Sequence, residues 1–142
     1  RFSEFIANCR LERDLICIDC NPSSSFMTTC ALQVATHVLV PVRPDRYSIL
    51  GLRMLNRFID GLQTLAKKPS IVVLLNGIKT SGYDPTVENA LRSDPDFGPM
   101  TLANSLHISR VLEASPSYTG FATDRRGQSW RVTPRITAIV MC

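Results

Sequence analysis

Short, continuously apolar runs alternate along the chain with longer amphipathic segments. The apolar runs cover residues 14–20, 37–42 and 70–75, and the last is β-branched at its centre, as buried strands often are. Between them, residues 26–35 and 45–67 repeat apolar side chains every three or four positions, which predicts helices. This order predicts an α/β fold: a parallel sheet with right-handed helical crossovers, in which both faces of each strand are covered.

The two ends of the chain give weaker patterns. Residues 1–13 lack the apolar core of a signal peptide and predict a helix. Beyond residue 77 the pattern predicts a short helix over 86–92, an edge strand over 100–103, and further helices over 105–114 and 129–141. No internal repeat or second domain is visible, so we expect a single domain over residues 1–142.

Composition narrows the class of protein. With 142 residues, 44% of them hydrophobic, the chain can bury a core of its own. No apolar run reaches the length of a membrane span, so we expect no membrane partner. The 5 cysteines show no disulfide-framework spacing, which favours a reduced, intracellular protein. The formal charge of +4 is too small to indicate a nucleic-acid partner by itself.

The candidate chemistry lies where the predicted strands end. Ligands of open parallel sheets bind at the carboxyl ends of the strands, and here these ends carry Asp19, Arg43 and the pair Asn76-Gly77. A carboxylate in such a position can hold Mg²⁺, directly or through water. From spacing alone, however, a capping or simply solvated Asp19 remains the favoured interpretation.

The segment around Asp19 resembles a family motif. Residues 14–23 read D-L-I-C-I-D-C-N-P-S, which is similar to the Walker B segment of the ParA/MinD-type partition ATPases, D-x-I-I-I-D-x-P-P-S. Residues 29–52 continue the resemblance in register and are similar to T-x-x-A-L-x-A-A-D-x-V-L-I-P-V-x-P-E-x-x-x-L-x-G-L. Residues 110–120 resemble the family's R-L-S-E-A-P-S-x-G, with insertions.

The resemblance implies a site for ATP and Mg²⁺. Asp19 would be the Walker B acid, which coordinates Mg²⁺ through water. Pro22 and Ser23 would belong to the switch segment that senses the γ-phosphate. Asn76, at the end of the third strand, would lie where the family contacts the nucleotide base.

The resemblance also implies partners. It implies a protein of the bacterial cytoplasm, associated with the nucleoid, that forms a homodimer with ATP, binds DNA non-specifically and meets a partition adaptor protein. Arg110 matches an arginine in a region that supports DNA binding in the family. Arg125 and Arg126, in the basic tail, are further candidates because phosphate contacts need only clustered arginine or lysine.

The chain departs from the family in one major respect. The family's Walker A loop, K-G-G-x-G-K-[ST], holds phosphates with backbone amides and lysines, and no glycine-containing stretch of this sequence has that spacing. The aspartate that orients the attacking water also lies upstream in the family. Phosphoryl transfer depends on positioning and charge neutralisation, so we expect these residues alone not to hydrolyse ATP and assign no catalytic residue.

We therefore interpret the chain as the carboxyl-terminal part of a ParA-like ATPase of chromosome or plasmid partitioning. Its fold would be that of a P-loop NTPase from the Walker B strand onward, without the amino-terminal strand and the Walker A loop. The alternative function is a non-catalytic α/β module that binds DNA or a protein without nucleotide turnover.

Other reactive side chains favour structural roles. Cys17 and Cys20 form a C-x-x-C, but this spacing on a strand points the thiols to opposite faces, and no second Cys or His pair completes a zinc site. The serines of residues 23–25 lack a G-x-S-x-G elbow and are predicted to cap the next helix. Arg53 and Arg57 are predicted to lie on a solvated helix face.

Overall fold

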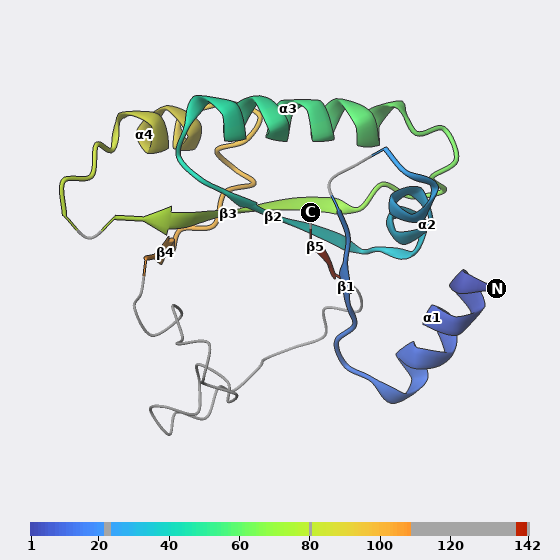
Figure 1. The fold of residues 1–142 in the computed structure, drawn as a ribbon. Coiled ribbons are helices and arrows are strands. Elements are labelled where there is room, and N and C mark those ends of the chain that lie inside the picture. The colour runs from blue at the N-terminus through green and yellow to red at the C-terminus, as the bar shows by residue number, and fades with distance from the viewer. Residues whose placement is uncertain (22–23, 80, 109–138, 142) are drawn as a thin grey trace, which may run out of the picture.

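We describe the fold from a computed structural model, which defines residues 1–21, 24–79, 81–108 and 139–141. Parallel strands form one sheet in the order β1-β5-β2-β3-β4 (Figure 1). The strands are β1 (Cys17–Asp19), β2 (His37–Val42), β3 (Ser70–Ile78), β4 (Leu106–His107) and β5 (Ile139–Met141). The helices are α1 (Phe2–Glu12), α2 (Phe26–Val34), α3 (Arg46–Gly61) and α4 (Thr86–Arg92). The predicted fold class, a parallel α/β sheet with helical crossovers, is confirmed.

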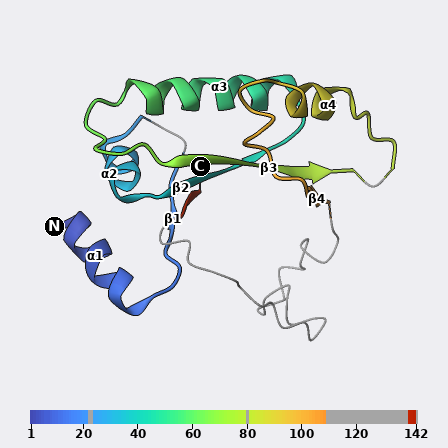
Figure 2. The same cartoon turned by 180° about the vertical axis from the view of Figure 1, so that it is seen from behind.

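The helices α3 and α4 lie together on one face of the sheet, and α1 lies beyond the opposite face (Figures 1 and 2). The connections from β2 to β3 and from β3 to β4 move in the same direction across the sheet. Right-handed crossovers therefore place their helices on the same side. This arrangement leaves the carboxyl ends of the strands at one edge of the sheet.

The core lies between α3 and the two long strands. Val38 and Val73, on neighbouring strands, are 0% exposed, and Leu52 and Ile59 of α3 pack against the same cluster at 2%. Fully burying a side chain of this size contributes about 1.5–3 kcal/mol. The expectation that both faces of every strand are covered is wrong for β1, where alternate positions are exposed because the strand forms an edge of the sheet.

Side chains that hydrogen-bond to the backbone begin the two central helices. The Asp45 carboxylate accepts a hydrogen bond of 2.8 Å from the Ser48 amide at the start of α3. Ser25 accepts one of 3.2 Å from the Thr28 amide at the start of α2, which confirms the predicted capping role for this serine. Both residues satisfy amides that have no partner within their own helix.

The long helix ends earlier than its apolar spacing predicts. It stops at Gly61, although the pattern continues to residue 67. Leu62 and Leu65 still pack against the core, but they do so from the turn that follows the helix. Their three-residue spacing therefore reflects burial rather than helical structure, and glycine is a poor helix former at this boundary.

The predictions for the last third are partly wrong. The helix over 86–92 is confirmed as α4, whereas the predicted edge strand over 100–103 is reduced to one bridge between Val73 and Thr101. The helices predicted over 105–114 and 129–141 are wrong where the structure describes them, because β4 and β5 occupy those positions. The segment of β4 is a strand because it pairs with β3, and the segment of β5 is a strand because it pairs with β1 and β2. Residues 109–114 and 129–138 lie outside the described residues.

Candidate functional site

Asp19 is the last residue of β1 and its side chain is exposed. It pairs in register with Met141 of β5, which pairs with Leu39 of β2. The strand β2 continues beyond that level to Val42. Asp19 therefore lies at an earlier level along the strand direction than the carboxyl ends of β2 and β3.

The carboxylate of Asp19 has no hydrogen bond or ion pair with the residues that the structure describes. Burial, followed by the charge of Asp19, raises the pKa of the adjacent Cys20 thiol, which favours its neutral form. The described part of the chain contains no cluster of three His, Cys, Asp or Glu side chains that could hold a metal. A single free carboxylate suits Mg²⁺, which takes one or two protein carboxylates together with phosphates and water.

A cavity of about 380 Å³ opens between the ends of β2 and β3. Arg43 approaches the backbone of Gly77 across it, and Tyr83 comes from the loop before α4. Asp45 also lines it, and hydrogen bonds from the Ser48 amide and hydroxyl lower the pKa of its carboxyl. The lining residues are Arg43, Pro44, Asp45, Gly77, Lys79, Gly82, Tyr83 and Asp84.

Asn76 is exposed and lies one residue before this cavity without lining it. It stands opposite Leu106 of β4, and β3 continues past it to Ile78, so Asn76 is not the end of the strand as predicted. Three strand spacings and four residues of rise separate it from Asp19, a distance of about 20 Å. A single ion cannot bridge these two positions, whereas an extended nucleotide can.

A larger cavity, of about 610 Å³, lies between β2 and α3. Its walls are apolar side chains such as Val40, Leu55 and Phe58, with the hydroxyls of Ser24 and Ser48 also among its lining. No titratable group lines it. This cavity therefore offers no acid or base, unlike the smaller cavity and the end of β1.

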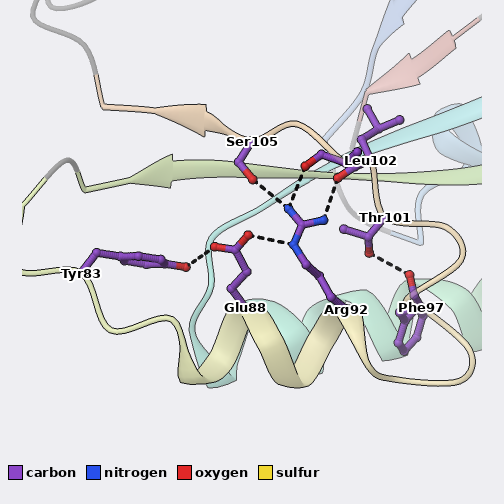
Figure 3. Close-up of polar contacts among 8 residues, drawn as sticks. Tyr83, Glu88, Arg92, Phe97, Thr101, Leu102 and Ser105 are labelled. Carbon is purple, nitrogen blue, oxygen red and sulfur yellow. Dashed lines mark hydrogen bonds and ion pairs between the residues drawn. The ribbon is translucent and has the colours of Figure 1, made fainter.

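Arg92 of α4 forms hydrogen bonds that connect the segment after α4 to this helix (Figure 3). Its guanidinium donates to the Leu102 carbonyl at 3.0 Å and to the Ser105 hydroxyl at 3.0 Å, and it pairs with Glu88 at 2.8 Å. Glu88 in turn accepts a hydrogen bond of 2.7 Å from the Tyr83 hydroxyl, which fixes one wall of the small cavity. This network was not predicted from the sequence, although the four-residue spacing of Glu88 and Arg92 is typical of an ion pair on a helix.

The network shifts two pKa values in opposite directions. Burial, followed by the hydrogen bond to Glu88, raises the pKa of Tyr83 to about 12. Burial tends to raise the pKa of Glu88, but donors from Tyr83 and Arg92 outweigh it, and the net pKa is lowered. At neutral pH, Tyr83 is therefore a neutral donor and Glu88 an ionised acceptor.

The sequence model of a family described as an AAA domain matches residues 1–73, just over half of the chain. The chain belongs to this AAA-domain family. A protein described as chromosome partitioning protein ParA from Myxococcus xanthus is 43% identical over 49 residues, 34% of this chain and 17% of that protein. A ParA family protein from Chlamydia muridarum is 33% identical over 64 residues, 45% of this chain and 25% of that protein. The ParA-type resemblance is thereby confirmed.

A longer match covers most of the chain. An uncharacterized protein from Pseudomonas putida is 27% identical over 124 residues, which is 83% of this chain but 45% of the relative. The chain thus spans less than half the length of this relative. No solved structure matches the chain at a significant level. Among the described residues, none of the helices of this AAA-domain protein has the length and apolar content needed to cross a bilayer.

The structure of this ParA-type chain places only part of the predicted site. Asp19 and Asn76 are described, and they lie on different strands and at different levels along the strand direction. The other predicted site residues lie outside the described residues: Pro22, Ser23, Arg110, Arg125 and Arg126. Asp19 and Asn76 are therefore the two predicted site residues whose separation can be compared with the length of a nucleotide.

Two predictions outside the site are confirmed. Cys17 is exposed, whereas Cys20, directly after β1, packs against the core, as expected for thiols that point in opposite directions. Arg53 and Arg57 are exposed on α3, as predicted, but Arg53 also has partners that were not predicted. Its guanidinium pairs with Asp94 at 2.9 Å and lies 5.9 Å from the ring centre of Phe97. The turn after α4 brings these partners to α3, which no local pattern in the sequence indicates.

Proposed function

We propose that the natural protein containing this chain is an ATP-dependent partition switch of the ParA type. ATP and Mg²⁺ would stabilise a homodimer, the dimer would bind DNA non-specifically, and an adaptor protein would stimulate hydrolysis and release. The observation that supports this proposal is the free carboxylate of Asp19 at the carboxyl end of β1, within the segment that matches the family. Proteins of this type act in the bacterial cytoplasm at the nucleoid, and we propose the same location.

Within this proposal, residues 1–142 form one domain that supplies the Walker B side of the site. Asp19 would hold Mg²⁺ through water, and Pro22 and Ser23 would follow the presence of the γ-phosphate. Asn76 would meet the base at the far end of the nucleotide. Mg²⁺, when bound, neutralises charge on the phosphates. An exposed carboxylate without a partner among the described residues fits that role, because no ion pair with them has to be broken.

Arg110, Arg125 and Arg126 are proposed to contact DNA phosphates. Such contacts release counterions, so affinity should fall steeply with salt and depend little on DNA sequence. Replacing Arg125 and Arg126 together by alanine should reduce the slope of log affinity against log salt by about two. An unchanged slope would remove these arginines from the interface.

The proposed switch is tested by Asp19→Asn in the natural protein that contains this chain. We expect Mg²⁺-dependent ATP turnover to be abolished, because the variant removes the carboxylate but keeps the size of the side chain. Asp14→Asn is the matched control, since Asp14 is exposed and precedes the strand. Unchanged turnover in Asp19→Asn would remove this residue from the site.

A second candidate function is a non-catalytic binding module. The observation that favours it is the absence of any K-G-G-x-G-K-[ST] spacing in the sequence. Calorimetric titration of the natural protein that contains this chain with Mg-ATP separates the candidates. Tight binding would contradict the module, whereas DNA binding without nucleotide binding would support it.

A further inference from the structure

We propose that the cavity between the ends of β2 and β3 is a stacking slot for a planar heteroaromatic ring, with the guanidinium of Arg43 as its platform. The ring would be the base of the nucleotide, so this inference rests on the proposed function and deepens it. It adds Arg43 and Gly77, which line the cavity, to the proposed contact of the base with Asn76, which precedes Gly77 and does not itself line the cavity.

Gly77 permits the position of Arg43. Its φ of +73° lies in the left-handed region that side chains rarely adopt. A Cβ on Gly77 would lie 3.2 Å from Nε of Arg43 and 3.8 Å from its Nη2. The guanidinium therefore rests closely against the backbone of Gly77, and any side chain at this position would push it away.

Arg43 forms no side-chain hydrogen bond or ion pair within the described part of the protein, whereas Arg53 pairs with Asp94 and Arg92 pairs with Glu88. Its charge acts there only at longer range, where it adds to the hydrogen bonds from Ser48 in lowering the pKa of Asp45. Lys79, which lines the same cavity, has no such partner in these residues either. A cation that lines a cavity without a protein partner is available to a ligand.

The acidic residues of the cavity are already engaged. Asp45 accepts hydrogen bonds from the Ser48 amide and hydroxyl. Asp84 accepts 2.9 Å and 2.6 Å hydrogen bonds from the amide and hydroxyl of Thr86. These bonds direct both carboxylates toward their own helix starts, so neither forms an ion pair with Arg43.

Planarity then identifies the class of ligand. A guanidinium is flat and weakly hydrated, and it stacks on aromatic rings. The ring of Tyr83 lines the same cavity, and its hydroxyl is fixed 2.7 Å from Glu88. The cavity of about 380 Å³ falls within the range of small-molecule sites. A flat side chain, a fixed aromatic ring and a glycine without a side chain together suit a purine.

The test is a titration of the 142-residue chain with adenosine, followed by the backbone amide signals of Gly77 and Gly82 in NMR spectra. Adenosine has no phosphate and needs no Mg²⁺, so the result is independent of Asp19. We expect saturable shifts at both glycines. Arg43→Lys, which keeps the charge but loses the plane, should weaken binding about tenfold.

Three comparisons make the test decisive. Gly77→Ala should weaken adenosine binding as Arg43→Lys does, and the double variant should be no weaker than either single one. Arg46→Lys is the matched control, because Arg46 is exposed and does not line the cavity, and it should bind like the wild type. Absence of shifts at both glycines, full affinity in Arg43→Lys, or shifts caused by tripolyphosphate but not adenosine would each overturn the slot. Failure of the proposed switch would instead appear as unchanged turnover in Asp19→Asn.

Discussion

The carboxyl ends of β1, β2 and β3 lie at the same end of the sheet, but the strands differ in how far they are buried. Val38, Val73 and Leu75 are fully buried beneath α3, whereas Cys17 and Asp19 are exposed on an edge strand. The predicted metal-binding acid thus lies in the thinly covered region, and the cavity lies beside the rigid one. A nucleotide spanning both would stabilise the weaker region by binding across it.

The core should be much more sensitive than β1 to loss of apolar side chains. Leu75→Ala should lower the free energy of unfolding by about 2–5 kcal/mol, because Leu75 is fully buried and the surrounding side chains fill the space left by the substitution only in part. Ile18→Ala should cost about 1 kcal/mol, since Ile18 is only half-buried. Urea unfolding measures both. Equal losses would contradict the division into a rigid and a thinly covered region.

Arg92→Ala should destabilise the segment that forms the outer part of the rigid region. We expect a loss of about 2 kcal/mol, because the variant removes a charged donor from carbonyls and from Glu88. Amide hydrogen exchange over residues 101–107 should accelerate more than exchange in β2. Arg92→Lys, which keeps the charge, should recover part of the loss, and unaltered exchange in Arg92→Ala would refute the role of this network.

The cap of α3 should contribute less. Asp45→Ala should cost about 1 kcal/mol, whereas Asp45→Asn, which also caps helices, should cost little at neutral pH. The Ser48 amide lowers the pKa of Asp45, so its contribution is present above the unfolded pKa and lost as pH falls through the folded value. Asp45→Asn should therefore weaken the dependence of stability on acid pH. An identical acid profile in wild type and Asp45→Asn would argue against this assignment.

Tyr83 should matter least at neutral pH. Tyr83→Phe should cost about 0.5 kcal/mol there, since one hydrogen bond to Glu88 is lost. The pKa of Tyr83 is raised to about 12, so the protonated side chain stabilises the fold below its unfolded pKa. This contribution is lost as pH rises from about 10 toward 12. Over that interval the free energy of unfolding should fall less steeply with pH in Tyr83→Phe than in the wild type. Parallel curves of stability against pH would show that the hydroxyl is not held as described.

The parts of the fold that follow from local pattern were predictable. The run from His37 to Val42 and the helix over 86–92 coincide with β2 and α4, because apolar periodicity and turn residues agree there. Where the structure describes them, the helices predicted at 105–114 and 129–141 are replaced by β4 and β5, short strands that depend on distant partners. No local signal specifies such pairing.

The sequence suggests candidate residues for the site but not their geometry. Asp19 and Asn76 follow from the ends of apolar runs, yet their different levels along the sheet depend on strand register. The cavity wall depends on the approach of Arg43 to Gly77 and on the bond from Tyr83 to Glu88. Both are contacts between segments that the sequence does not align.

The most direct test is a titration of the natural protein containing this chain with Mn²⁺-ATP, followed by amide NMR. Mn²⁺ replaces Mg²⁺ and broadens signals close to the metal. We expect strong broadening at residues 19–21 and a shifted but much less broadened signal for Gly77, because about 20 Å separates the two strand ends. Broadening centred on Gly77, or none at residues 19–21, would contradict the assignment of the metal to Asp19.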